Sequence, residues 1–261
     1  MSKLIISNWI GRTGNNILQI IRAIHYGKVN GYNHLLFTNN RYFSQGESQL
    51  IILNDTINNN KKPIFDSFFN IKKLGCNDPN PYLMKKYFQK YLKDIIDFKV
   101  NFLPDNNNTL HIHIRGGDVF RGNGAHPAYV QPPLKYYKDI IESKNWDKIT
   151  VVYEDTGNPC VNALKEQNYE NIDFTSNNLE TDINILCQAQ NLVLGFGTFG
   201  LLLFFLNKNI KNIYIPKYVI EELPKGNWGD VIMNIIDLPN YIKCGEWKNE
   251  ESQKRMMLTY K

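Results

Sequence analysis

Cysteine and long apolar runs are both scarce in this sequence. Four cysteines in 261 residues lie far apart, at Cys76, Cys160, Cys187 and Cys244, and none forms a C-x-x-C pair. This density excludes a secreted disulfide scaffold and favours reduced thiols. No apolar run approaches the roughly 20 residues that span a bilayer, and the apolar start at residues 1–7 is too short for a signal peptide. We therefore expect a cytoplasmic protein without a membrane span.

Several motifs of known chemistry are also missing. There is no D-x-D pair, which metal-dependent sugar transferases use to hold Mg²⁺ or Mn²⁺ on a diphosphate. There is no G-x-S-x-G elbow and no kinase motif set, and the glycine turn at 11–14 is neither a Walker loop nor a G-x-G-x-x-G fingerprint. No block of five like charges occurs, so the net charge of +5 suits an anionic small ligand better than nucleic acid. A bound diphosphate would have to be neutralised by arginine, backbone N–H groups and helix ends.

The sequence does alternate predicted strands and helices. With 43% apolar residues, the chain can bury the core of one large or two small α/β domains. A polar run at 104–108 marks the expected boundary between a half at 1–105 and a half at 106–261. Strands that alternate with helices predict a parallel sheet covered on both faces. We expect an α/β fold with two Rossmann-like halves that face a cleft.

Hydrophobic periodicity gives the expected elements. The first half has a strand at 3–7, a helix with Ile17, Ile20, Ile21 and Ile24 on one face, and a strand at 34–37. Residues 39–80 show no clear pattern, and 82–98 are expected to be helical. In the second half we expect strands at 110–115, 149–153, 172–174 and 191–194, with a last strand at 212–215. Helices are expected at 134–143, 161–167, 181–189 and 199–206.

The strongest local signal is a polar row in the strand at 110–115. Strand alternation places His111, His113 and Arg115 on one face and apolar residues on the other. A buried parallel strand is normally apolar on both faces, and such a departure is typical of a functional site. Arg115 stands at the carboxyl end, where open α/β sheets bind ligands, and its donors match phosphate oxygens. The alternative is an edge strand with one solvent-facing side.

The connection from 116 to 133 is longer than the usual 4–6 residues, which is typical of a functional loop. It contains Asp118, Arg121 and His126, which are able to move a proton or hold an acceptor hydroxyl. The alternative is a surface excursion. A metal site at His111 and His113 is disfavoured because two histidines are too few ligands.

Two glycine-bearing turns open helices and are candidate anion sites. The turn at 195–198 precedes an apolar helix, with Thr198 as its expected cap, and the turn at 11–14 precedes the first helix. A helix start offers unpaired N–H donors and partial positive charge. The alternative at both turns is a helix start without a ligand.

Taken together, these elements resemble the fucosyltransferase superfamily that includes the α-1,2 and α-1,6 fucosyltransferases and the protein O-fucosyltransferases. His113, Arg115 and Asp118 match the family signature H-x-R-x-x-D. The family's glycine loop, often G-R-x-G-N-Q, is similar to Gly11-Arg12-Thr13-Gly14-Asn15-Asn16. Its carboxyl-terminal motif, an aspartate opening a helix and a Ser/Thr sixteen residues later, is similar to Asp182 and Thr198. The resemblance covers residues 3–26 and 110–216.

The resemblance implies a GT-B-like fold and an inverting, metal-independent transfer of fucose from GDP-fucose to a glycan acceptor, without a cofactor. It implies that Arg115 holds the β-phosphate and stabilises departing GDP. It further implies that His113 and Asp182 contact the guanine and Thr198 the phosphate, with Phe199 beside it in the donor site. The loop at 11–16 is implied to close over the diphosphate and fucose from the other half.

The sequence departs from the family in two places. Gly116 stands where many members have a second arginine, and Asn123 stands where the α-1,6 branch has a catalytic glutamate. The general base is therefore open between Asp118, His126 and a base-free, dissociative route. Acceptor recognition is expected in residues 39–105 and in the loop at 116–133. The aromatic side chains of these two segments either stack on sugar rings or belong to the core. These aromatic residues are Phe65, Phe68, Phe69 and Tyr129.

Three other functions stay open. One is a transferase that uses another nucleotide sugar, such as GDP-mannose, because Arg115 and Thr198 would hold any diphosphate. The missing glutamate favours a non-catalytic GDP- or glycan-binding module. A nucleic-acid binder rests only on the sequence pI of about 8.8, and no basic stripe supports it.

Overall fold

The chain divides into two compact units. The computed structural model describes residues 2–38, 48–54, 61–96, 100, 104–122 and 125–261. The first unit is Met1–Phe98 with Pro224–Trp228, and the second is Lys99–Leu223 with Gly229–Lys261. The expected boundary after residue 105 falls inside the second unit, because Asp105 donates its N–H to the Gln188 carbonyl (3.1 Å) and accepts from Gln190 Nε2 (2.7 Å). The short return to the first unit at 224–228 was not expected.

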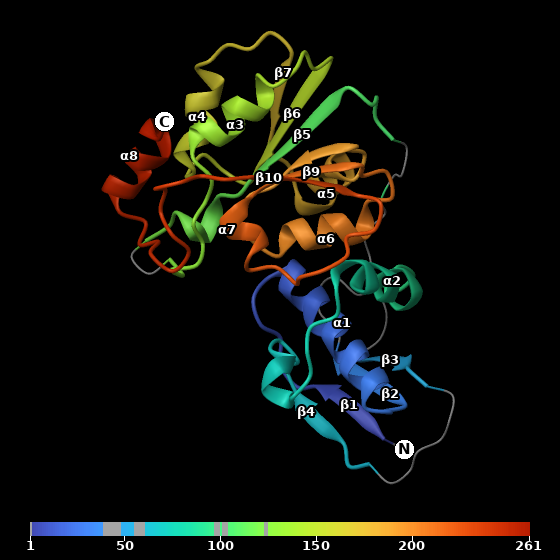
Figure 1. Ribbon diagram of the computed structural model, residues 1–261. Helices are drawn as coiled ribbons and strands as arrows, with labels where there is room; N and C mark the ends of the chain where they lie inside the picture. The colour runs from blue at the N-terminus through green and yellow to red at the C-terminus, as the bar shows by residue number, and fades with distance from the viewer. Residues whose placement is uncertain (1, 39–47, 55–60, 97–99, 101–103, 123–124) are drawn as a thin grey trace. The chain divides into compact units, whose positions relative to one another are not determined.

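The first unit has a four-stranded mixed sheet in the order β3-β2-β1-β4 (Figure 1). Strands β1 (Lys3–Ile6), β2 (His34–Thr38) and β4 (Ile64–Asp66) are parallel, whereas β3 (Ser48–Ile52) runs antiparallel to β2. Helix α1 (Thr13–Val29) packs against β1 and β2, and its predicted isoleucine face is fully buried. The expected β1-α1-β2 succession is confirmed, but the expectation of a wholly parallel sheet is wrong for this unit.

Residues 39–80, which showed no pattern, contribute β3, β4 and a short 3-10 helix, η1 (Ile71–Leu74). Helix α2 (Pro81–Tyr91) begins after Asn80, whose side chain accepts from the Leu83 N–H at 2.9 Å. It ends seven residues before the predicted end at residue 98, which lies outside the described residues. Of the aromatic side chains considered for acceptor binding in this region, Phe68 is fully buried and Phe65 is 64% exposed.

The second unit has a six-stranded, fully parallel sheet in the order β10-β9-β8-β5-β6-β7. The strands are β5 (Thr109–Ile114), β6 (Lys148–Tyr153), β7 (Ile172–Thr175), β8 (Asn191–Val193), β9 (Asn212–Pro216) and β10 (Ile232–Ile236). The parallel α/β arrangement is confirmed here. The strand expected at residues 212–215 is present as β9, but it is not the last strand, because β10 follows it and pairs with it in parallel.

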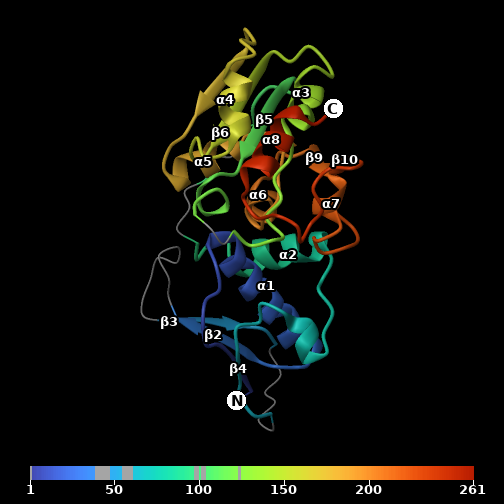
Figure 2. The same cartoon turned by 90° about the vertical axis from the view of Figure 1, so that its left-hand side faces the viewer.

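Helices cover this sheet on both faces, as the two views show (Figures 1 and 2). One face is covered by α3 (Leu134–Ile141), α4 (Pro159–Lys165) and α8 (Glu251–Thr259), which share a core with the apolar side chains of β5. The other face is covered by α5 (Leu179–Leu186) and α6 (Phe199–Leu206), while α7 (Lys217–Ile220) contacts β9 and β10. Within the described residues, no helix has the length and apolarity needed to cross a membrane.

Candidate functional site

The candidate site lies at the carboxyl end of β5, in the middle of the six-stranded sheet. Strand β5 pairs in parallel with β6 on one side and β8 on the other, so the edge-strand alternative is wrong. Leu110, Ile112 and Ile114 are fully buried on the face of α3, α4 and α8. The polar row therefore lies on the opposite face, which α5 and α6 cover. This is the end of an open α/β sheet at which ligands bind.

His113 packs against the first residue of α6. The centroids of the His113 and Phe199 rings lie 4.7 Å apart, at an interplanar angle of 47°. Burial, together with the positive charge of Arg115, lowers the pKa of His113 from 6.5 to about 3. Because the imidazole stays neutral near pH 7, His113 can make hydrogen bonds to a ligand but does not take up a proton there.

Arg115 is held from three sides. Its Nη2 donates to Asp118 Oδ1 at 3.0 Å, and its guanidinium carbon lies 5.1 Å from the centroid of the Tyr129 ring. A Cβ added at Gly197 would lie 3.0 Å from Nη1, so the glycine leaves room for the guanidinium. The side chain is only 13% exposed, and its Nε has no hydrogen-bond partner in the described part of the chain. An arginine with a buried, unsatisfied donor is suited to an anionic ligand.

The turn before α6 brings a helix start to the same place. Thr198 occupies the N-cap position, but its backbone angles are helical and, within the described chain, its side chain gives no capping hydrogen bond. Thr198 therefore occupies the predicted N-cap position, but the capping hydrogen bond expected from its side chain is absent among the described residues. The Gly197 backbone has a φ of +132°, which favours glycine. The first N–H groups of α6 and the guanidinium of Arg115 are thus near each other.

The loop from 116 to 133 is packed in its described part, so the surface-excursion alternative is wrong there. Asp155, just after β6, accepts from the Gly117 N–H at 3.2 Å and from Arg121 Nη2 at 2.7 Å. Burial raises the pKa of Asp155, but hydrogen bonds from Gly117, Gly157 and Arg121 outweigh it and hold the pKa below its ordinary value. Nearby, Asn158 donates to the Arg115 carbonyl at 3.0 Å. Asn123, where the related glutamate would stand, lies outside the described residues.

The two candidate bases are both engaged. Asp118 forms an ion pair with Arg115, and its side chain is 48% exposed. His126 is exposed, and its Nδ1 accepts from the Ala128 N–H at 3.3 Å. Because a backbone N–H can only donate, the neutral His126 ring carries its proton on Nε2. His126 therefore presents a donor in this geometry, and it must break the Ala128 bond before it can act as a base.

Asp182 lies in the first turn of α5. Its carboxylate accepts from the backbone N–H of Asn177 (3.2 Å) and from Asn177 Nδ2 (3.1 Å), at the start of α5. Burial raises the pKa of Asp182, and the bonds from Asn177 oppose that rise. Among the described residues, its hydrogen bonds thus hold the turn between β7 and α5. A contact of Asp182 with a guanine stays a prediction.

The glycine loop belongs to the first unit. Gly11 has a φ of +70°, and a Cβ there would collide with the side chain of Asn15. Arg12 is the N-cap residue of α1, so Gly14 and Asn15 lie in its first turn. The expectation of a tight glycine turn before a helix is confirmed, whereas its closure over a diphosphate stays a prediction.

Two buried amides, Asn16 and Gln19, fix that loop, and only Asn16 was predicted from the sequence to belong to it. Asn16 Nδ2 donates to the Ile10 carbonyl at 3.1 Å. Gln19 is fully buried, and in the amide orientation that satisfies its neighbours it donates to the carbonyls of Asn8 (3.2 Å) and Ser67 (3.0 Å). The available signal was helical spacing, because Asn16 and Gln19 are three residues apart on one stripe of α1.

The site also contains Asp155 and Asn158, for which the sequence indicated no role, and Tyr129, which was expected either to stack on an acceptor sugar or to belong to the core. Asp155 and Asn158 follow β6 and hold the loop after Arg115, and Tyr129 faces the guanidinium. The Tyr129 ring also lies 5.0 Å from His126 and 5.9 Å from Phe196, centroid to centroid. The rule that selected Arg115, a polar residue at the carboxyl end of a strand, would also have selected Asp155.

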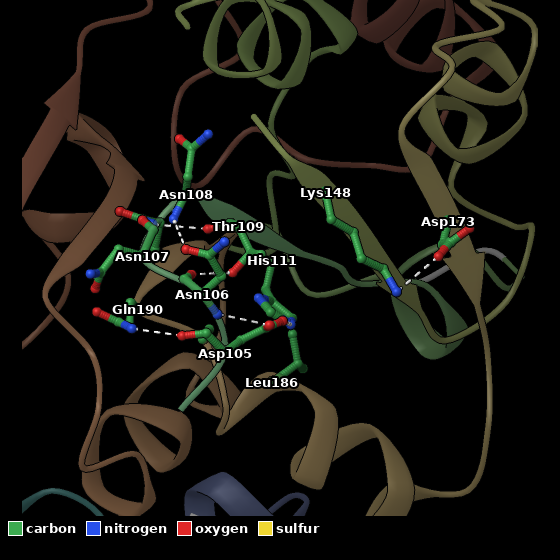
Figure 3. A network of polar contacts seen from close by, with 12 residues as sticks. Asp105, Asn106, Asn107, Asn108, Thr109, His111, Lys148, Asp173, Leu186 and Gln190 are labelled. Atoms are coloured by element: carbon green, nitrogen blue, oxygen red, sulfur yellow. Dashed lines mark hydrogen bonds and ion pairs between the residues drawn. The ribbon is translucent and has the colours of Figure 1, made fainter. Parts of the chain in front are cut away.

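The amino end of the same strand has a second polar cluster. His111 Nε2 lies 3.7 Å from Asp105 Oδ2, and Gln190 donates to the Asp105 carbonyl (Figure 3). The pKa of His111 is lowered to about 4. Burial is the main cause; the negative charge of Asp105 opposes this shift, and the positive charge of Lys148 adds to it. Among the described residues, no group of three or more His, Cys, Asp or Glu side chains is placed to hold a metal ion.

Comparisons with known proteins add no relative. No family model, curated protein or solved structure matches this chain. The class that the fold defines is a Rossmann-like α/β protein, and the candidate site is a cluster of arginine, histidine and aromatic side chains beside a helix start.

Proposed function

We propose that this protein is an inverting, metal-independent glycosyltransferase that moves fucose from GDP-fucose to a glycan hydroxyl. The observation that carries the proposal is Arg115, whose guanidinium is held by Asp118 and Tyr129 beside the start of α6 and keeps a buried donor for a ligand. Its place in the motif His113-x-Arg115-x-x-Asp118 supports the choice of donor.

The chemistry needs positive charge where the leaving group departs. An acceptor oxygen attacks the anomeric carbon from the face opposite the diphosphate, and the electron pair of the broken C–O bond goes to a β-phosphate oxygen. Arg115 and the N–H groups at the start of α6 supply charge-assisted hydrogen bonds to that oxygen. They take the role that a metal ion has in transferases with a D-x-D pair.

The neutral His113 suits a binding role in this proposal. With a pKa lowered to about 3, it keeps one ring nitrogen as a donor and the other as an acceptor across the physiological range. It thus holds the nucleotide without adding charge. The proton of the acceptor hydroxyl goes to Asp118, to His126 after it leaves Ala128, or to solvent in a dissociative route.

The test is calorimetric titration of GDP and GDP-fucose in the presence of EDTA. We expect Arg115→Ala to weaken GDP binding about 10- to 100-fold, because a charge-assisted hydrogen bond contributes about 1.5–3 kcal/mol. The matched control is Arg255→Ala, which removes the same charge from an exposed position on α8. If the folded wild type binds no GDP, or if both variants lose the same affinity, the proposal is wrong. Parallel titration of GDP-mannose tests the other nucleotide sugar.

The second candidate function is a non-catalytic GDP- or glycan-binding module. The observation that favours it is that Asp118 is paired with Arg115 and His126 presents a donor rather than a base. The two functions differ in turnover. GDP binding together with neither hydrolysis of GDP-fucose nor transfer to any glycan would select the binding module.

A further inference from the structure

The segment after β10, residues 237–249, runs along the loop that connects β5 to α3. Donors in this tail bond to carbonyl oxygens of the loop. They are Trp247 Nε1 to Val119 (3.1 Å), Gly245 N and Trp247 N to Pro127 (3.0 and 3.1 Å), Asn249 Nδ2 to Gly122 (3.2 Å) and Tyr241 Oη to Gln131 (2.8 Å). Val119 and Gln131 are buried, and buried carbonyls outside a ladder need such partners, so the tail specifies the conformation of the loop.

Trp247 is the centre of this contact. Its side chain is fully buried and is the largest of the fully buried side chains in the described chain. Its ring meets the Phe120 ring edge to face, with centroids 5.5 Å apart. One residue therefore fixes the loop through its indole N–H, its backbone N–H and its ring.

The fixed points of the loop adjoin the side chains of the candidate site. Val119 follows Asp118, and Pro127 follows His126. At the start of the loop, Asp155 accepts a hydrogen bond from the Gly117 N–H. The loop is thus fixed where it presents Asp118 and where it presents His126 and Tyr129.

We propose that Trp247 is a positioning residue for the site, and that the tail at 237–249 sets the geometry in which the loop presents Asp118, His126 and Tyr129. The role in turnover rests on the proposed function, whereas the fixing of the loop does not. The tail then contributes to the geometry of the candidate site as well as to the core. Small displacements of reacting groups cost rate more than ground-state affinity.

The experiment compares Trp247→Phe with Trp146→Phe. Both tryptophans are buried, and both donate Nε1 to a backbone carbonyl, Trp146 to that of Ile140 at 3.2 Å. Amide hydrogen exchange, GDP affinity, and the kcat and KM of GDP-fucose hydrolysis are measured for each. We expect Trp247→Phe to speed exchange at residues 117–133 and to lower kcat on the order of 10- to 100-fold, with GDP affinity changed by less than about threefold. Trp146→Phe should leave the exchange of that loop and kcat close to wild type.

A second pair covers the case in which Trp247→Phe does not fold. Asn249→Gly removes the bond to the Gly122 carbonyl, and glycine readily adopts the φ of +60° found at this position. The control is Asn240→Gly, which replaces an exposed asparagine with a similar φ of +61°. Only the first should speed exchange of the loop and lower kcat. Equal exchange of the loop in the members of a pair, or a loss of GDP affinity as large as the loss of kcat, overturns the positioning role. If wild type binds no GDP, the proposed function fails, and the exchange of the loop alone decides whether the tail fixes it.

Discussion

The two ends of β5 each carry a histidine, and the surroundings of the two histidines differ. At the amino end, His111 lies beside Asp105 in a cluster whose amides bind backbone carbonyls (Figure 3). At the carboxyl end, His113 lies against Phe199 and next to Arg115, which keeps a buried Nε without a partner among the described residues. At the amino end, His111 Nδ1 and Gln190 Oε1 also lack a partner among the described residues, so the two ends differ in charge: the unsatisfied atoms there belong to neutral groups, whereas Arg115 offers a cationic donor that suits an anionic ligand.

The largest expected effect concerns both ends together and depends on pH. An unfolded histidine takes up a proton below its ordinary pKa of 6.5, whereas His111 does so only below about 4 and His113 below about 3. Between these values the unfolded state binds more protons, so the free energy of unfolding falls as the pH is lowered from 6.5 to 4. For His111 alone the loss is on the order of 3 kcal/mol.

Urea unfolding at a series of pH values measures this loss. His111→Gln should remove a large part of the slope between pH 6.5 and pH 4 and leave the part due to His113. A slope that is unchanged in His111→Gln would show that His111 is already protonated in the folded state or that other groups dominate.

The next effect separates the two ends by stability. Asn191 is buried at the amino end, and its Nδ2 donates to the carbonyls of Asn107 and Thr109, both at 2.9 Å. Asn191→Ala leaves these carbonyls without their donor and should lower the free energy of unfolding by about 2–4 kcal/mol. Chemical denaturation measures this loss, and GDP affinity should stay within about twofold of wild type below the transition. A large loss of affinity in the folded variant would contradict this separation of the two ends.

A smaller effect tests the space left for Arg115. Gly197→Ala places a methyl group 3.0 Å from Nη1 of Arg115, at a φ of +132° that costs about 1–3 kcal/mol. We expect GDP affinity to fall about tenfold, because the guanidinium has to move. Gly122→Ala is the control, since it also has a positive φ, +68°, but its added Cβ meets no described atom within 4 Å. Equal affinities in the two variants would remove Gly197 from the site.

The smallest effect concerns Thr198. Thr198→Val removes the hydroxyl but, in the described part of the chain, no capping hydrogen bond, because the Thr198 side chain does not cap α6. If the hydroxyl binds a phosphate, GDP affinity should fall about three- to tenfold in calorimetry. Thr198→Ser, which keeps the hydroxyl, should retain the affinity of wild type, and a weaker Thr198→Ser would point to packing of the methyl group instead.

The sequence predicted the regular elements where periodicity is local. The apolar faces of α1 and β5 follow from spacings within one element, so they were found without the fold. Strand β10 was missed because it is an edge strand with Ile232 and Ile235 exposed, and its pattern lacks a buried face. Strands β3 and β4 are the short edge strands of the mixed sheet. They were missed because the segment at 39–80 shows no clear hydrophobic pattern.

The candidate site divides in the same way. The spacing of His113, Arg115 and Asp118 is contained within six residues, so the sequence itself selected them. The sequence could not predict that Tyr129 faces Arg115, that Asp155 binds the Gly117 N–H, or that Asp182 turns to Asn177.

By itself, the sequence determined that this is an α/β chain with a polar row at the end of one strand, because strand alternation and helix periodicity are properties of consecutive residues. Only the tertiary structure decided that this strand is central, that Trp247 holds the loop beside it, and that His113 is neutral while Asp155 stays charged. These properties depend on which distant segments exclude water and supply hydrogen bonds, and no local pattern records them.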